Sequence, residues 1–131
     1  EPLRPVLAVL AKRGLLYVDT GAAVFGAAPA LAKTAGVPIA IVDRTIDRVP
    51  TKAAIDHELA DLETLARRRG WAFGLATAYP SSFDRLAAWA ATLESKGIVL
   101  VPVSAIAQAP SAVGQGGALQ TPSAALARGG P

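Results

Sequence analysis

The sequence contains no cysteine, no methionine and a single histidine, and aromatic residues make up only 5% of it. Without cysteine the chain can form neither a disulfide nor a thiolate site. The single histidine, His57, falls inside a predicted helix, where we expect it at the surface. One helical histidine cannot supply the several converging ligands of an ordinary zinc site. No serine lies in a G-x-S-x-G turn, which argues against a serine hydrolase of that type.

Long apolar runs and a strong charge of one sign are also absent. Lys, Arg, Asp or Gly interrupts every apolar run before it reaches the ~20 residues of a membrane span. The net charge of +3, from 13 basic and 10 acidic residues, is small and scattered. We therefore expect no membrane span and no nucleic-acid partner. Because the chain starts at Glu1 and lacks methionine, we expect it to begin within a longer gene product, with any signal peptide upstream.

One pattern occurs four times along the chain: a helical segment ends in basic residues, a glycine follows, and a continuous apolar run begins. Basic side chains in a last helical turn complement the helix dipole, and glycine takes the left-handed position that ends a helix. Continuous apolar runs are typical of strands covered on both faces. We therefore expect strands in the runs LLYV, VPIAIV, WAFGLA and IVLVPV, which begin at residues 15, 37, 71 and 98.

Helical patterns fill the intervals between these strands. We expect helices over residues 3–13, 29–35, 52–69 and 82–96, with Thr51 capping the third and Ser81 and Asp84 starting the fourth. Alternating helices and strands predict an α/β fold with a parallel sheet and right-handed crossovers. We assign residues 1–107 to this domain and interpret the Ala/Gly/Pro/Ser-rich segment 108–131 as a flexible tail.

Polar side chains gather where the predicted strands end, which is where parallel sheets place their functional sites. Asp19 and Asp43 follow two successive strands, and we assign them as candidate catalytic residues that share one crevice. Two such carboxylates could hold a metal, orient a histidine or share a proton. The structural alternative is that Asp19 caps the following turn and Asp43 pairs with Arg44 or Arg48. The candidate substrate-binding residues are Thr20, Asp47, Thr77 and Tyr79.

Two motif matches do not fit this pattern. The letters DTGA at residues 19–22 match the aspartic-protease signature, but those enzymes consist of short strands and hairpins, not of long helices between strands. The glycines form neither G-x-G-x-x-G nor Gly-Lys-Ser/Thr, which argues against a flavodoxin-like or nucleotide-binding domain. We interpret residues 67–69 as a solvated helix end and both tryptophans, Trp71 and Trp89, as core residues.

Four segments resemble, in order and spacing, the divergent polysaccharide deacetylases, a bacterial family with a NodB-like distorted (β/α) barrel. GLLYVDTGAA (14–23) resembles that family's G-L-F-F-L-D-S-R-T. GVPIAIVDRTIDRVP (36–50) resembles its G-V-P-x-A-x-x-D-x-F-L-D-x-x-P, which places Asp43, Asp47 and Pro50 on family positions. RRRGWAFGLATAYPSSFDRLAAW (67–89) resembles R-x-G-x-A-I-G-I-G-H-P-Y-P-x-T-L, and LESKGIVLVPVSAI (93–106) resembles the closing strand. The resemblance runs from Leu3 to Ile106 and corresponds to the carboxyl-terminal half of the barrel.

The resemblance implies that the full-length protein removes acetyl groups from an envelope polysaccharide or peptidoglycan-type glycan, in the periplasm or outside the cell. A divalent metal such as zinc would assist the hydrolysis. The family's metal site lies mainly in the other half of the barrel, so we expect no cofactor in this chain and no activity of the chain alone. Residues 20–22 replace the family's Ser-Arg-Thr, and residues 76–78 replace its Gly-His-Pro. These departures keep a second class open: a catalytically inactive glycan-binding or protein-assembly module of the cell envelope.

The fold implied by the resemblance is a partial barrel, whose strands expose an edge and an apolar face. We therefore expect the chain to form an open parallel sheet and either to pair with the missing amino-terminal half or to self-associate.

Overall fold

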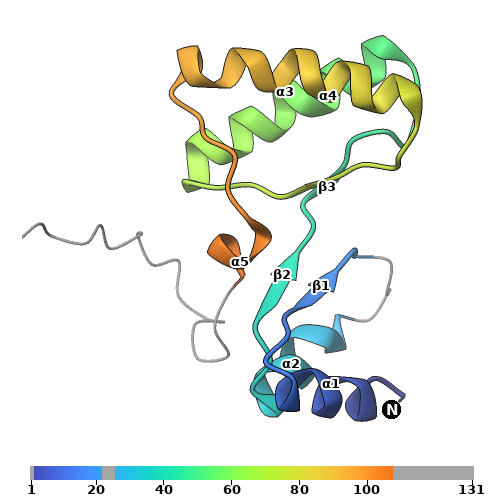
Figure 1. Cartoon of the computed structure of the whole chain (residues 1–131), viewed down its shortest axis with the longest axis vertical. Coiled ribbons are helices and arrows are strands. Elements are labelled where there is room, and N and C mark those ends of the chain that lie inside the picture. Colours follow the sequence, from blue (N-terminus) through green and yellow to red (C-terminus); the bar gives the residue numbers. More distant parts are fainter. Residues whose placement is uncertain (1, 22–25, 108–131) are drawn as a thin grey trace, which may run out of the picture.

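A computed structural model of the chain describes residues 2–21 and 26–107. Helices and short strands follow one another (Figure 1), in the order α1 (Leu3–Lys12), β1 (Tyr17–Asp19), α2 (Ala27–Ala35), β2 (Ile39–Ile41), β3 (Arg44–Thr45), α3 (Lys52–Arg69), β4 (Gly74–Leu75), α4 (Pro80–Leu93), the 3-10 turn η1 (Glu94–Lys96) and α5 (Val103–Ile106). The predicted α/β fold is confirmed. The predicted tail, 108–131, lies outside the described residues.

The strands pair in parallel, β1 with β2 and β3 with β4. β2 and β3 belong to one extended segment that changes partner between Val42 and Asp43. The amide of Val42 donates to the carbonyl of Asp19 (2.8 Å), and the amide of Asp43 donates to the carbonyl of Phe73 (2.9 Å). Successive amides of an extended chain point to opposite sides. β1 and β4 therefore lie along opposite edges of this central segment.

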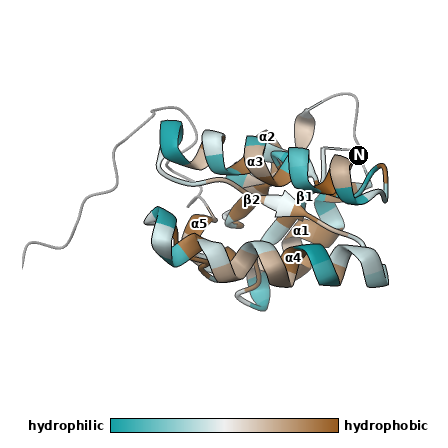
Figure 2. Cartoon of the chain, turned by 90° about the horizontal axis from the view of Figure 1, so that it is seen from above, coloured by the Kyte–Doolittle hydropathy of each residue, from teal (hydrophilic) through white to brown (hydrophobic). Residues whose placement is uncertain are grey.

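Each pair of strands has its own hydrophobic core. We call the two cores lower and upper after their places in Figure 1. The lower core lies between α1, α2 and the β1–β2 pair and consists of Leu7, Ala28, Ala32, Val37 and Ile39. The upper core lies between α3 and the β3–β4 pair and consists of Ile46, Ile55, Leu59 and Leu62, against which Leu86 and Trp89 of α4 pack. Figure 1 shows the two helix pairs at opposite ends of the molecule with the strands between them. Figure 2 shows polar and apolar residues along each helix, as expected of helices with one buried face.

The ends of α3 agree with the sequence pattern. The hydroxyl of Thr51 accepts a hydrogen bond from the amide of Ala54 (3.3 Å), which confirms the predicted cap. The helix stops at Gly70, whose φ of 92° lies in the left-handed region that favours glycine. The predicted boundaries, 52–69, match those observed.

The start of α4 differs from the prediction. The helix begins at Pro80, with Tyr79 at the N-cap and no side-chain cap, so the expected start at Ser81 and Asp84 is wrong. The φ angle of proline is already fixed near the helical value. Proline also has no backbone N–H, and the N–H of a first helical residue would have no partner within the helix. Pro80 can therefore begin the helix without a side-chain cap.

The last predicted strand is also wrong. Residues 98–102 form no strand, and Val103 begins the short helix α5. A strand requires a neighbour to accept and donate its backbone hydrogen bonds. No described strand lies beside this stretch to exchange hydrogen bonds with it. The strand-forming composition of the stretch is therefore not sufficient to make it a strand. The runs at 15–18 and 71–76 give shorter strands than expected for the same reason: only β2 and β3 are available to pair with them.

Candidate functional site at the strand ends

The structure brings the six candidate residues together in two groups. Asp19 is the last residue of β1 and Thr20 follows it, and both lie near Asp43, which joins β2 to β3. The second group, formed by Asp47, Thr77 and Tyr79, lies where β3 and β4 end. No hydrogen bond or ion pair between described residues links one group to the other. Asp19 and Asp43, the two residues expected to share one crevice, both belong to the first group, and the second group forms a separate neighbouring site.

A polar pocket of about 390 Å³ lies beside the first group. It is lined by Thr20 and Gly21 after β1, by Val42, Asp43, Arg44 and Thr45 of the central segment, and by Arg48 and Glu58. Asp19 is not among the lining residues. Its Oδ1 instead accepts a hydrogen bond from the amide of Gly21 (2.9 Å), as the structural alternative proposed. Thr20 and Asp43 are therefore the two candidates that a molecule in this pocket would meet.

Asp43 is held by Arg69, not by Arg44 or Arg48. The two Nη atoms of Arg69 donate to its two carboxylate oxygens at 3.0 and 2.6 Å, and the amide of Phe73 donates to Oδ2 at 2.8 Å. The side chain of Asp43 is only 15% exposed. A bidentate guanidinium–carboxylate pair of this kind is among the stronger polar contacts in proteins. Most of the hydrogen-bonding capacity of Asp43 is therefore used inside the protein.

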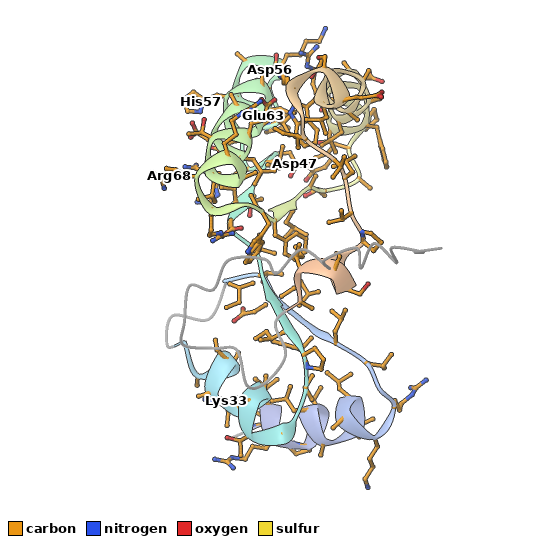
Figure 3. All side chains as sticks on the ribbon, turned by 90° about the vertical axis from the view of Figure 1, so that its left-hand side faces the viewer. Lys33, Asp47, Asp56, His57, Glu63 and Arg68 are labelled. Atoms are coloured by element: carbon orange, nitrogen blue, oxygen red, sulfur yellow. The ribbon has the colours of Figure 1, made fainter. Side chains whose placement is uncertain are left out.

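Arg69 joins several elements, so the helix end at 67–69 is not simply solvated. Its Nε donates to the carbonyl of Trp71 (3.2 Å), and its guanidinium lies 3.9 Å from the centre of the Trp71 ring. Arg67 donates to the carbonyl of Lys96 (2.9 Å). Arg68 alone agrees with the prediction, since Figure 3 shows it on the outer side of α3. Trp71 is partly exposed and covers Arg69, which corrects its interpretation as a core residue.

The remaining charges of the pocket are unevenly paired. Arg44 contacts Glu58 (3.0 Å) and Asp61 (3.2 Å). Arg48 is exposed and forms no ion pair or hydrogen bond with another described residue. His57 is 73% exposed, 3.7 Å from Asp61, which confirms its predicted surface position. The pocket thus holds two carboxylates and two guanidinium groups, of which the Arg48 guanidinium has no partner among residues 2–21 and 26–107.

Asp47 organises the second group from inside the protein. It is 3% exposed, and its Oδ2 accepts hydrogen bonds from the amide of Thr77 and the hydroxyl of Ser82, both at 2.6 Å. Its Oδ1 is buried and has no partner among the described residues. Figure 3 shows Asp47 in the interior of the upper half. The loop that it fixes carries Thr77 and then Tyr79, whose side chain is half exposed at the start of α4.

The described carboxylates do not fit a divalent metal. No three His, Cys, Asp or Glu side chains among residues 2–21 and 26–107 converge as metal ligands would. Asp43 is occupied by Arg69 and Phe73, and Asp47 by Thr77 and Ser82.

Glu63 of α3 joins this helix to α4 and η1. Its Oε1 accepts hydrogen bonds from Lys96 Nζ (2.7 Å) and from Trp89 Nε1 (2.8 Å). The Lys96 ammonium, more than any other group, lowers the pKa of Glu63 below its ordinary value, with the Trp89 hydrogen bond and the charge of Arg67 acting in the same direction against desolvation. These contacts attach α4 and η1 to α3.

Sequence reasoning missed Arg69 and Ser82, the partners of the two central carboxylates. The parallel register pairs Arg44 with Gly74, which sets Asp43 beside Phe73. Arg69 lies only four residues before Phe73, so this register, had it been assigned, would have predicted the Asp43–Arg69 pair. No comparable feature of the sequence predicts the contact of Ser82 with Asp47, because a serine near the start of a helix is usually interpreted as a cap.

Short parallel strands that alternate with helices define an α/β domain, and its polar pocket lies where the strands end. Within that class, the model of the family described as Divergent polysaccharide deacetylase matches residues 1–107, and the chain belongs to this family.

The crystal structure of the uncharacterized protein ATU2773 from Agrobacterium tumefaciens C58 is similar to this chain, with a TM-score of 0.76 and 36% sequence identity. The similarity covers 79% of this chain and 42% of ATU2773, so the chain spans less than half of that protein. No curated protein matches the chain. Over the residues that the structure describes, no helix is both long and apolar enough to cross a bilayer.

Proposed function

We propose that this chain is the glycan-binding part of a polysaccharide deacetylase that acts on an envelope polysaccharide or peptidoglycan-type glycan, in the periplasm or outside the cell. The observation that carries the proposal is the polar pocket at the strand ends of a chain that belongs to the deacetylase family. Tyr79 adds an exposed aromatic ring in the neighbouring group, where it would stack against a sugar.

The charges of the pocket favour a neutral, hydroxyl-rich ligand. Asp43 and Glu58 balance Arg44 and Arg48, so neither an anion nor a cation gains from the sum of the charges. Sugar hydroxyls both donate and accept, and the pocket offers guanidinium donors, carboxylate acceptors and the hydroxyls of Thr20 and Thr45. An acetylated amino sugar is neutral, whereas its deacetylated product carries an ammonium group. A pocket whose formal charges sum to zero gains nothing from that ammonium group, so its fit to the acetylated sugar rests on hydrogen bonds to the sugar hydroxyls.

Hydrolysis itself is assigned to the full-length protein. Metal-assisted removal of acetyl groups requires a set of ligands that the described carboxylates do not provide, because Asp43 and Asp47 are engaged by other groups. We expect the zinc ion, or another divalent metal, and the residues that hold it to lie outside the described part of this chain. The chain alone would bind glycan and remain inactive.

The proposal is tested by measuring acetate release from acetylated chitooligosaccharides and zinc content, on this chain and on the complete gene product side by side. Activity and bound zinc in the complete product only would support the proposal. If neither form released acetate while the chain still bound the oligosaccharide, the alternative of a catalytically inactive glycan-binding module would replace it. That alternative is favoured by Thr77, which stands where the family's Gly-His-Pro has histidine.

The pocket is tested separately with Arg48→Ala. This change removes the unpaired guanidinium and should weaken oligosaccharide binding about tenfold, the size expected for one lost charge-assisted hydrogen bond. Arg68→Ala, which removes an exposed arginine of α3 outside the pocket, is the matched control and should leave binding unchanged. Isothermal titration calorimetry measures the affinity of both variants for the oligosaccharide. If Arg48→Ala bound it as tightly as Arg68→Ala, the pocket would be ruled out as the glycan site.

A further inference from the structure

Two aromatic rings lie exposed at the start of α4. Tyr79 and Phe83 are 48% and 61% exposed. The amide of Phe83 donates to the carbonyl of Tyr79 (3.1 Å), so the two residues are one helical turn apart, about 6 Å along the helix axis. Trp89, further along the same helix, packs against the upper core instead. Exposed aromatic side chains that lie together in a folded protein often mark a binding surface.

The turn that carries the two rings is anchored from inside the protein. Oδ2 of Asp47 accepts hydrogen bonds from the amide of Thr77 and from the hydroxyl of Ser82, both at 2.6 Å. Thr77 lies two residues before Tyr79. Ser82, which is 1% exposed, directly precedes Phe83. Because the backbone on both sides of the first ring is fixed before a ligand arrives, little conformational freedom is lost on binding.

The two rings neighbour the polar pocket. Arg48, which lines the pocket, directly follows Asp47. Val49 comes next and is 55% exposed, so the apolar surface begins beside the arginine of the pocket. The hydrogen bonds of Asp47 therefore hold the start of α4 close to the loop that carries Arg48. A polymeric glycan is longer than the pocket, so the sugars beside the one that fills it need a surface of their own.

We propose that Tyr79 and Phe83 form a stacking subsite, which binds the sugars next to the one held in the pocket. The carbon-bound hydrogens on the face of a sugar ring carry a small positive charge, and the face of an aromatic ring is negative. One helical turn is also similar to the length of one sugar residue in a β-1,4-linked chain, so successive sugars can meet successive rings. The inference rests on the proposed function and deepens it, because it defines the ligand as an oligosaccharide and assigns Phe83 to its binding.

A protein partner fits the two rings less well than a glycan does. Each partner in a stable protein complex buries about 800 Å², whereas this patch consists of two half-exposed rings. The exposed residues beside the rings include Thr77 and Asp84, whose hydroxyl and carboxylate groups suit sugar hydroxyls. Phe83 also stands where the family's motif P-Y-P-x-T-L has leucine, so the second ring is a feature of this chain that the family motif does not predict.

Isothermal titration calorimetry with fully acetylated chitohexaose tests the inference on this chain. Phe83→Ala should weaken binding about fivefold, the size expected for one lost aromatic contact. Phe83→Trp, which keeps a ring, should bind as tightly as the wild type. Phe83→Leu, which keeps an apolar side chain without a ring, should bind as weakly as Phe83→Ala. Val9→Ala removes a similarly exposed apolar side chain of α1 and serves as the control. The urea midpoint of Phe83→Ala should equal that of the wild type, because an exposed side chain adds little to stability.

Two results would overturn the inference alone. If Phe83→Ala bound chitohexaose as tightly as the wild type, the ring would take no part in binding. If Phe83→Leu bound it as tightly as the wild type, apolar contact would account for the affinity and there would be no stacking subsite. In both cases Arg48→Ala would still weaken binding, so the proposed function would stand. If the wild type bound no oligosaccharide at all, the proposed function itself would fail, and the stacking subsite with it.

Discussion

At the scale of single residues, Asp47 illustrates how a buried carboxylate can shape a site without entering it. Two short hydrogen bonds to one of its oxygens connect the end of β3 to the loop after β4 and to the first turn of α4. Asp47→Ala would leave the amide of Thr77 and the hydroxyl of Ser82 without an acceptor inside the protein. We expect a loss of about 3 kcal/mol in the free energy of unfolding, measured by urea denaturation.

Asp84→Ala is the matched control, because Asp84 is an exposed acidic residue of α4, and its loss should cost less than about 0.5 kcal/mol. Ser82→Ala should cost about 1 kcal/mol, and the double variant Asp47→Ala/Ser82→Ala should cost less than the sum of the two. Additive effects would mean that the two side chains stabilise the loop independently.

The position of the candidate residues at strand ends could be predicted from the sequence, but the contacts of their side chains could not. Placement at strand ends was sufficient to select Thr20 and Asp43, which line the pocket. It did not reveal that Asp43 is bound by Arg69, since that contact depends on the register of β3 against β4. Nor did it show that Asp47 is buried, because burial of a charge depends on the donors that surround it.

At the scale of elements, the attachment of α4 to α3 depends on pH through Glu63. The Lys96 ammonium lowers the pKa of Glu63 in the folded protein, so the ionised form stabilises the fold. This stabilisation is complete above the unfolded pKa, which is about 4.3 for glutamate, and disappears as the pH falls through the lowered folded value. Glu63→Gln should therefore cost about 1 kcal/mol near neutral pH and almost nothing at strongly acidic pH.

Urea denaturation of the wild type and of Glu63→Gln at several pH values measures this difference. Glu94→Gln, at an exposed glutamate of η1, is the control and should behave as the wild type throughout. If the difference in unfolding free energy between the wild type and Glu63→Gln stayed the same in acid, the variant would have lost stability through packing and not through the charge of Glu63.

Helices were predicted more accurately than strands, for a physical reason. A helix satisfies its backbone internally, so the glycine stops and the 3.6-residue period in the sequence set the ends of α1 and α3 to within a residue or two. A strand depends on a neighbour. The run IVLVPV has strand composition, yet the structure offers it no partner strand among the described residues, and it remains unpaired between η1 and α5.

At the scale of the whole molecule, two cores share one extended segment. The lower core is covered by helices of 10 and 9 residues, and the upper core by helices of 18 and 14 residues that are further joined by the Arg85–Asp56 and Lys96–Glu63 pairs. The halves are joined by the central segment, where the Asp43–Arg69 pair fastens β3 to the chain before β4, and by α5, which follows the upper half and contacts β2. Such a molecule need not unfold in one step.

We expect the lower half to unfold at lower urea concentration than the upper half, because shorter helices and smaller buried residues stabilise it less. Both tryptophans belong to the upper half, so their fluorescence reports on it alone, while amide exchange at Leu7 and Ile39 reports on the lower half. Arg69→Ala should lower the midpoint of the fluorescence transition, since it releases Asp43, whereas Arg68→Ala should not. Coincident transitions of the two probes would instead show that the central segment couples the cores into one cooperative unit.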